Sequence, residues 1–167
     1  KGKETATFPY DLKALKSENK NFSILRPTPF ANDMLTDFTL EMIKNEKLGQ
    51  DTDTDFVTLS FSSTDYAGHN FGVNAKEIQD MYIRLDLNIA KILNYLDENI
   101  GEGEYTLFFT ADHGAVQVPN YLKDHNIPAG YFESKQLRKD VLEFVESKFE
   151  NQDLIEGFSN NQIFFDY

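Results

Sequence analysis

Cysteine and tryptophan are absent from the 167 residues of this chain. The lack of cysteine excludes a disulfide framework, cysteine-ligated zinc and thiol catalysis. No run of apolar residues approaches the ~20 that a membrane-spanning helix requires. Basic residues are scarce too, since 16 Lys and Arg stand against 28 Asp and Glu and leave a net charge of −12. An acidic chain lacks the basic surface of nucleic-acid-binding modules, so we expect no binding to a nucleic acid duplex. Because no apolar run is long enough, we expect no membrane segment.

Apolar residues make up 40% of the chain, and 15 Phe and 8 Tyr supply large side chains for a hydrophobic core. This composition argues against global disorder, and we expect residues 1–167 to form a single domain. The chain begins at Lys1 without a methionine and ends in the strand-like segment Gln162–Tyr167. We therefore expect an internal fragment of a longer protein, with a short strand over Thr5–Tyr10.

Helical and strand-like segments alternate along the chain. Apolar residues at helical spacing predict helices over Asn32–Gly49, Asn74–Asn99 and Ser134–Phe149. Runs of β-branched and aromatic residues predict strands over Phe56–Phe61 and Tyr105–Thr110. The residues expected on the buried faces of the three helices are Leu35, Phe38, Met42 and Ile43; Ile78, Met81, Tyr82, Leu85, Ile89, Ile92, Leu93 and Leu96; and Leu137, Val141, Phe144, Val145 and Phe149.

The order strand, long helix, strand between Phe56 and Thr110 is that of a βαβ unit. Such a crossover joins parallel strands, so we predict an α/β fold with a largely parallel sheet and flanking helices. In open sheets of this class, ligands bind beyond the carboxyl ends of the strands. The candidate site is therefore expected in the loop Ser62–Val73 and the turn Ala111–Gly114.

Both segments contain an aspartate and a histidine: Asp65 and His69 in the first, Asp112 and His113 in the second. Parallel pairing of the two strands would bring these four side chains together. Imidazole nitrogen and carboxylate oxygen are ligands of Zn²⁺, and the set supplies half of each of two sites. Paired metal ions are a common clamp for displacement at phosphorus. The four residues are our predicted metal ligands, against the alternative of ordinary surface loops rich in Asp and Gly.

Other residues near these motifs carry narrower expectations. We expect Gly68 to let the backbone bend so that His69 turns toward Asp65. We expect Gly114 to let the chain leave Asp112 and His113 without a side chain that fills the site. Thr64 is either a nucleophile or a hydroxyl bonded to the local backbone, and the second is the usual use of threonine. His125 is either a further ligand or a surface histidine, and we favour the surface because no strand end delivers it to the site.

Two motifs together resemble a known family. They are Ser-Ser-Thr-Asp-Tyr-Ala-Gly-His-Asn-Phe-Gly over Ser62–Gly72 and Phe-Thr-Ala-Asp-His-Gly-Ala over Phe109–Ala115, separated by the long helix. The pair resembles the alkaline phosphatase superfamily and, within it, the type I phosphodiesterase/nucleotide pyrophosphatase family. The residue sequence of the first motif is most similar to that of the bacterial phosphate-irrepressible alkaline phosphatases. The resemblance extends from about Phe56 to about Tyr131 and implies that the chain is part of an alkaline phosphatase-like core.

The resemblance also implies a role for each matching residue. Asp65 and His69 match the pair that holds one zinc ion, and Asp112 and His113 match ligands of the other, so two Zn²⁺ are the implied cofactor. The family's first aspartate, its threonine or serine nucleophile and its last histidine have no matching position and are expected outside Lys1–Tyr167. We therefore assign no catalytic nucleophile within this chain. The implied activity of the parent protein is hydrolysis of phosphate monoesters through a covalent phospho-enzyme, with the isolated chain inactive.

Alternative functions remain open at this stage. A phosphodiesterase or nucleotide pyrophosphatase would use the same metals on another substrate, as would a phosphonate or sulfate ester hydrolase. A degenerate or non-catalytic metal-binding domain belongs to a different class. The expected partner is a small phosphate ester, for which the acidic chain provides no long-range attraction. Family resemblance implies export to the periplasm or the cell exterior, and the sequence does not specify an oligomeric state.

Overall fold

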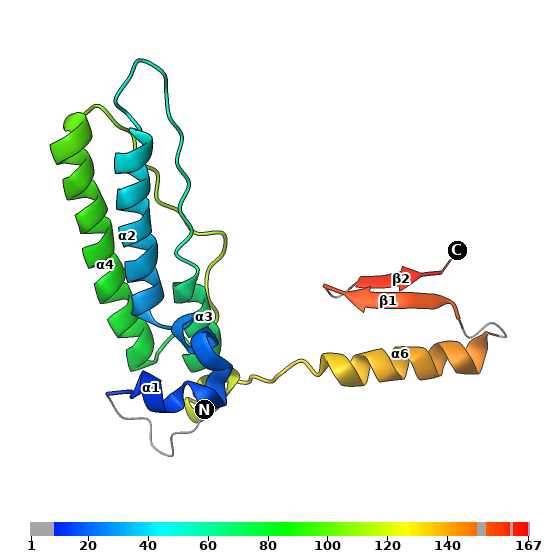
Figure 1. The fold of residues 1–167 in the computed structure, drawn as a ribbon. Coiled ribbons are helices and arrows are strands. Elements are labelled where there is room, and N and C mark those ends of the chain that lie inside the picture. The colour runs from blue at the N-terminus through cyan, green and yellow to red at the C-terminus, as the bar shows by residue number, and fades with distance from the viewer. Residues whose placement is uncertain (1–8, 150–152, 161, 167) are drawn as a thin grey trace. The chain divides into compact units, whose positions relative to one another are not determined.

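The computed structural model describes residues 9–149, 153–160 and 162–166, and divides the chain into two compact units, Lys1–Val118 and Pro119–Tyr167. Each unit is described on its own, and the single-domain expectation stays a prediction. Most of the short strand expected over Thr5–Tyr10 lies outside the described residues. Helices dominate both units (Figure 1).

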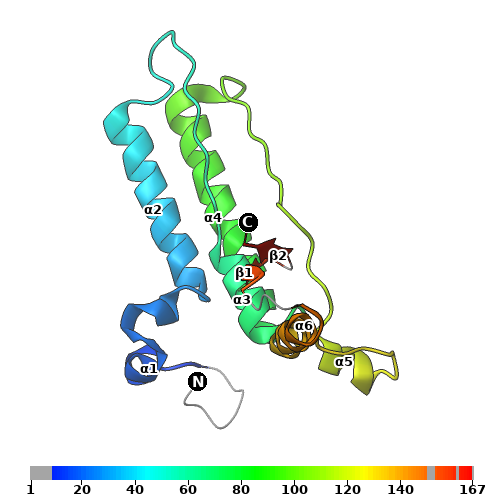
Figure 2. The same cartoon turned by 90° about the vertical axis from the view of Figure 1, so that its right-hand side faces the viewer.

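The first unit is built around two long helices that lie side by side, α2 and α4 (Figures 1 and 2). The helices of this unit are α1 Leu12–Leu15, η1 Ser17–Asn19, η2 Asn21–Leu25, α2 Pro29–Glu46, α3 Ser63–Phe71, α4 Lys76–Leu96 and the π-helical turn η3 Asp97–Gly101. Proline in the first turn of α2 starts that helix well, because the missing N–H has no partner there anyway. The short helix α3 packs on both long helices and carries the first predicted motif.

The long helix predicted over Asn74–Asn99 is confirmed in position and largely in its buried face. Its buried residues are Ile78, Met81, Leu85, Asn88 and Ile92. They recur at steps of three or four, which places them on one side of α4. Tyr82, expected on this face, is instead 58% exposed. Together with Ala67 of α3, Ile78 and Met81 form the buried apolar cluster that fixes α3 against α4.

The face that α2 buries is polar, which corrects the expected apolar stripe. Its buried residues are Asn32, Thr36, Thr39 and Ile43, whereas Phe38 is 67% exposed. The amide of Asn32 donates to the sulfur of Met81 at 3.3 Å. Across the same pair of helices Asn88 donates to Asp33 at 2.9 Å, and Lys91 pairs with Asp37 at 2.6 Å. Three polar contacts therefore join α2 to α4.

The two segments predicted as parallel strands are extended but form no strand. No strand is assigned to residues 56–61 or 105–110, and no backbone hydrogen bond joins these two segments to each other. Phe56 and Phe108 are each 87% exposed. The largely parallel sheet is thus not found in the part of the chain that the structure describes. The segments do run in the same direction, toward the end of the unit where α3 lies (Figure 1).

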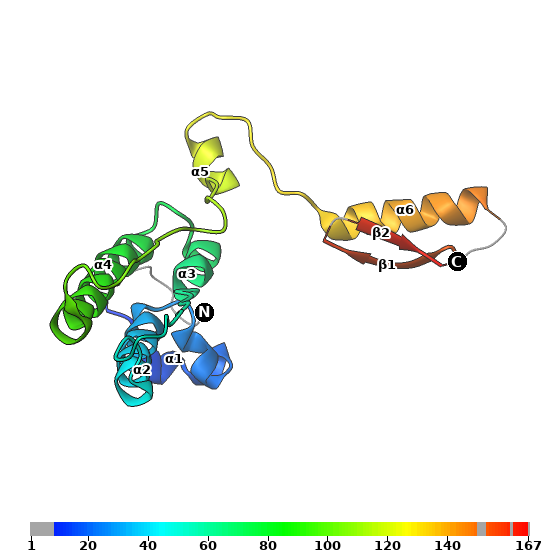
Figure 3. The ribbon, with the colours of Figure 1, turned by 90° about the horizontal axis from the view of Figure 1, so that it is seen from above.

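The second unit contains two helices and an antiparallel hairpin. Its elements are α5 Pro119–Asp124, α6 Ser134–Lys148, β1 Ile155–Ser159 and β2 Gln162–Phe165. In the hairpin Phe158 lies opposite Ile163, and the guanidinium of Arg138 on α6 lies 5.1 Å from the Phe158 ring centre. α6 and the hairpin lie side by side (Figure 3). The helix predicted over Ser134–Phe149 is confirmed, but of its expected inner face only Val145 is buried.

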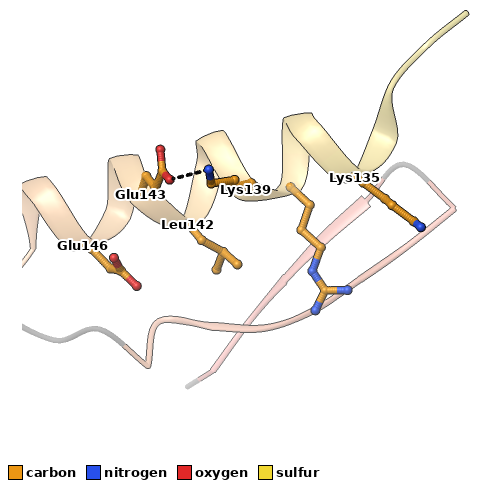
Figure 4. A pocket seen from close by; sticks show the side chains of 6 residues that line it. Lys135, Lys139, Leu142, Glu143 and Glu146 are labelled. Atoms are coloured by element: carbon orange, nitrogen blue, oxygen red, sulfur yellow. Dashed lines mark ion pairs between the residues drawn. The ribbon is translucent and has the colours of Figure 1, made fainter.

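One side of α6 carries a shallow hollow lined by charged side chains (Figure 4). The residues lining it are Lys135, Arg138, Lys139, Leu142, Glu143 and Glu146. Lys139 and Glu143 form an ion pair at 3.4 Å, as expected for residues four apart on a helix. None of the predicted site residues lines this hollow. Among the described helices, none is long and apolar enough to cross a membrane.

Tyr10 links the start of the described chain to α4. Its hydroxyl donates to Glu77 at 2.6 Å, and this hydrogen bond, with smaller contributions from burial and the charge of Glu77, raises the pKa of Tyr10 above 10.0. A raised pKa in the folded state means that the stabilisation is complete below about pH 10 and is lost as pH rises through the raised value. We expect Tyr10→Phe to lower the free energy of unfolding by about 1 kcal/mol at pH 8.

Urea denaturation of both proteins at pH 8 and above pH 10 measures this effect. The gap between wild type and variant should close at the higher pH. Tyr82→Phe is the matched control, because Tyr82 is exposed on the same helix as Glu77 and should be neutral at both pH values. A gap that persists unchanged above the raised pKa would contradict this account of the Tyr10 hydrogen bond.

Candidate functional site

Asp65 and His69 lie on a helix, not in the predicted loop. Residues Ser63–Phe71 form α3, and the four-residue spacing places both side chains on one face. Nε2 of His69 lies 3.4 Å from Oδ1 of Asp65. Gly68 sits inside this helix without a positive φ, so the bend expected there is not needed. Helical geometry alone brings the first pair of predicted ligands together.

The packing of α3 turns this pair outward. Ala67 is completely buried against α4, whereas the side chains of Asp65 and His69 are 50% and 75% exposed. Asp65 lies in the first turn of the helix and His69 in the last, where the helix dipole favours a negative and a positive charge respectively. The exposed pair is therefore held on a helix whose opposite face is anchored in the core.

Asp112 and His113 lie in a turn whose backbone orients the histidine. The backbone N–H of His113 donates to Asp112 at 3.1 Å, and Nδ1 of His113 lies 2.9 Å from the carbonyl oxygen of Gly114. Because a carbonyl oxygen only accepts, Nδ1 carries the proton in this contact, and Nε2 is the ring nitrogen left for other partners. A Cβ built at Gly114 would meet no described atom within 4 Å, so the need for glycine to leave the site unfilled stays a prediction.

The two motifs meet through Asp65. Nε2 of His113 lies 3.8 Å from Oδ1 of Asp65 and 3.8 Å from Oδ2 of Asp112. The hydrogen bond to Gly114 is the largest cause that raises the pKa of His113 above 6.5, followed by the negative charge of Asp112; desolvation lowers it, and Asp65 adds a smaller upward contribution. A single carboxylate oxygen thus faces histidines of both motifs.

The side chains of Asp65, His69, Asp112 and His113 are of the types that bind divalent metal ions. They offer carboxylate oxygens and an imidazole whose Nδ1 is held by a backbone carbonyl and whose Nε2 faces those carboxylates, and a held Nδ1 is usual for histidine ligands. Within residues 9–149, 153–160 and 162–166, however, no group of three or more His, Asp or Glu side chains is arranged to hold a metal ion. The four residues therefore fit as partial ligand sets and do not form a complete site by themselves.

Thr64 and His125 are two further residues for which the sequence allowed either a site role or a structural role. Oγ1 of Thr64 is buried and has no hydrogen-bond partner in the described part of the chain, so the expected bond to the local backbone is not found. Nδ1 of His125 lies 2.8 Å from the carbonyl oxygen of Tyr121, and the two rings stack with centres 4.2 Å apart. His125 thus has a local structural role in the second unit. The Gly114 carbonyl was missed, because sequence spacing does not show a ring-to-backbone contact.

Comparison with known proteins agrees with the two motifs. The family model described as type I phosphodiesterase / nucleotide pyrophosphatase matches residues 5–153. A protein of Myroides odoratus called "Calcium-transporting ATPase" is 47% identical over the whole chain, which covers 31% of that protein. Alkaline phosphatase PhoV of Synechococcus elongatus is 44% identical over 99% of the chain, covering 29% of PhoV. The chain thus spans about three tenths of the length of these relatives.

A solved structure is similar as well. The crystal structure of wild-type alkaline phosphatase PafA superposes with a TM-score of 0.88 at 36% identity, over 98% of this chain and 31% of PafA. Both the sequence match and the backbone match extend across nearly all of the chain, including α3 and the Asp112–His113 turn. The chain therefore belongs to the type I phosphodiesterase / nucleotide pyrophosphatase family of the alkaline phosphatase superfamily.

Proposed function

We propose that the full-length protein containing this chain is a zinc-dependent hydrolase of small phosphate monoesters. The observation that carries the proposal is the meeting of the two motifs at Asp65, whose Oδ1 lies 3.4 Å from His69 and 3.8 Å from His113. Family membership and the names of PhoV and PafA support phosphate ester hydrolysis. The related alternative is a phosphodiesterase or nucleotide pyrophosphatase that uses the same residues.

The four residues act in this proposal as ligands rather than as acids or bases. Asp65 and His69 would hold one Zn²⁺, and Asp112 and His113 the other. The bound ions would supply electrophilic stabilisation of the negative charge at phosphorus. The Gly114 carbonyl fixes the ring of His113 by accepting from Nδ1–H, so that Nε2 stays available. A threonine or serine outside this chain would attack phosphorus as the bond to the ester alcohol breaks and the alcohol leaves. Water would then hydrolyse the phosphorylated side chain and release phosphate. We also propose export to the periplasm or the cell exterior.

The assay that tests this proposal compares four substrates with and without a chelator. They are the monoester phenyl phosphate, the diesters diphenyl phosphate and thymidine 5′-phosphate phenyl ester, and ATP. ATP is included because one relative is called an ATPase. We expect the full-length protein to prefer the monoester, to lose turnover on chelation and to regain it with zinc. The isolated 167-residue chain is the matched control and should show no turnover, because the proposed nucleophile lies outside it.

The outcomes separate the alternatives. Preference for either diester would move the protein to the phosphodiesterase branch of the same family. Absence of turnover with zinc supplied would favour a degenerate or metal-binding protein. A clear zinc-dependent rate from the isolated chain would contradict the assignment of the nucleophile outside it.

A further inference from the structure

A surface cavity of about 360 Å³, open to solvent on the side of the exposed Phe22 and Met34, lies in the first unit beside the start of α3. Its walls come from η2, from the first turns of α2 and from residues 60–66. Much of the lining is apolar or aromatic, from Phe22, Leu25, Met34, Leu35 and Tyr66. Small-molecule sites in proteins begin at about 300 Å³ and are mostly apolar with a few placed polar groups. The cavity is thus of a size and character to receive a single ring.

One cation borders this cavity. Arg26 lines it, with the guanidinium carbon 5.8 Å from the centre of the Tyr66 ring. Among the described residues Arg26 makes no ion pair, although acidic side chains greatly outnumber basic ones in this chain. By contrast, Arg84 on α4 pairs with Asp80 at 3.1 Å. An unpaired guanidinium held over an aromatic ring is well placed to bind an anion.

Three serines, Ser60, Ser62 and Ser63, line the same cavity. Ser63 is only 7% exposed, lines the cavity, and its hydroxyl takes part in no hydrogen bond with residues that the structure describes. Ser62 stands at the N-cap of α3 but makes no capping bond, and its Oγ lies 2.9 Å from that of Ser60. A ligand oxygen beside Ser63 would give this hydroxyl a hydrogen-bond partner, because a serine hydroxyl can donate one bond and accept others.

The cavity adjoins the proposed metal ligands through Tyr66. Tyr66 lines the cavity and precedes His69 by three residues on α3, a spacing that makes the two side chains neighbours on the helix surface. Ser62 and Tyr66 share one face of α3, and Asp65 and His69 occupy the next face around the same helix. The cavity therefore shares its Tyr66 wall with the helix that carries Asp65 and His69, although neither of these two residues lines it.

We propose that this cavity receives the alcohol part of the phosphate ester, and that it selects an aromatic alcohol carrying a second anionic group. Arg26 binds that anion, Ser63 donates to it, and the apolar wall packs on the ring. This inference rests on the proposed function, because it places the phosphoryl group of the same ester near Asp65 and His69. Arg26 is then a specificity-determining residue for the leaving group.

Two substrates and two arginine variants test the proposal in the full-length protein. Phenyl phosphate and 4-carboxyphenyl phosphate differ only in the second anion. We expect Arg26→Met to lower kcat/KM about tenfold for the carboxylated ester and less than about twofold for phenyl phosphate, the size of one charge-assisted hydrogen bond. Arg84→Met is the matched control, because Arg84 also lies 5.8 Å from an aromatic ring, that of Phe30, but does not line the cavity. It should change neither rate.

A binding titration separates this inference from the proposed hydrolysis. 4-Hydroxybenzoate and phenol, the two alcohol products, are titrated into wild-type protein, Arg26→Met and Ser63→Ala by calorimetry. We expect 4-hydroxybenzoate to bind at least about tenfold more tightly than phenol, and both variants to reduce that preference. Equal affinities in the wild type, or a preference that Arg26→Met leaves intact, would overturn the assignment of the cavity. This holds whether or not the protein hydrolyses either ester, whereas lack of zinc-dependent turnover alone would contradict the proposed hydrolysis.

Discussion

The substitution Asp65→Asn is expected to lower kcat/KM for phosphate esters by at least about 100-fold in the full-length protein. Oδ1 of Asp65 is the atom that faces both His69, at 3.4 Å, and His113, at 3.8 Å. An amide keeps the shape of the side chain but removes the negative charge that a divalent cation requires. Steady-state kinetics with phenyl phosphate, together with the zinc content of the purified variant, measures both consequences. Loss of bound zinc should accompany the loss of rate.

His125→Asn is the matched control for this substitution. His125 stacks on Tyr121 and contacts the Tyr121 carbonyl oxygen at 2.8 Å, in the unit that does not contain Asp65. It should leave zinc content and kcat/KM within about twofold of wild type. Equal zinc content and equal rates for Asp65→Asn and wild type would remove Asp65 from the ligand set. A large loss of zinc in His125→Asn would restore the alternative that His125 is a ligand.

The helices of this fold follow closely from local sequence patterns, and the sheet does not. The stripe Ile78, Met81, Leu85 and Ile92 predicts both the position of α4 and most of its buried face. The segments 56–61 and 105–110 are extended, as their β-branched and aromatic residues predict, but a ladder also needs neighbouring strands that local sequence does not specify. The sequence also did not predict that the buried face of α2 is polar. Asn32 and Thr36 are buried because α2 packs on other helices, and local sequence does not show which face is covered.

The residues of the candidate site were proposed from the sequence, whereas their geometry was not. Their placement at the end of a predicted strand, and the family resemblance, pointed to Asp65 and His69. The structure brings these two together because Ser63–Phe71 is a helix, where residues four apart share one face. The approach of His113 to Asp65 depends on tertiary structure, which no periodicity reveals. The ring contact to the Gly114 carbonyl is a property of one turn conformation. The predicted ligand roles of all four residues remain to be tested by metal binding.

The chain leaving α3 passes close to Val118 at Gly72, and we expect Gly72→Ala to lower the free energy of unfolding by about 3 kcal/mol. Gly72 follows α3 with φ 83° and ψ 153°, a conformation that other residues rarely adopt. A Cβ built at this position would lie 2.5 Å from Cγ2 of Val118. Asn74 adds a hydrogen bond to Gln117 beside this contact. The chain leaving α3 thus packs directly on the chain leaving the Asp112–His113 turn.

Gly68→Ala is the matched control and should act in the opposite direction. Gly68 lies inside α3, and a Cβ there would meet nothing within 4 Å, so alanine should stabilise the helix by about 0.5–1 kcal/mol. Urea denaturation of the two variants gives both values, and zinc titration shows whether the motifs stay coupled. Because Gly72→Ala must push Val118 away, it should weaken zinc binding although it removes no ligand. Stability and zinc affinity unchanged in Gly72→Ala would mean that the approach of His113 to Asp65 does not depend on this contact.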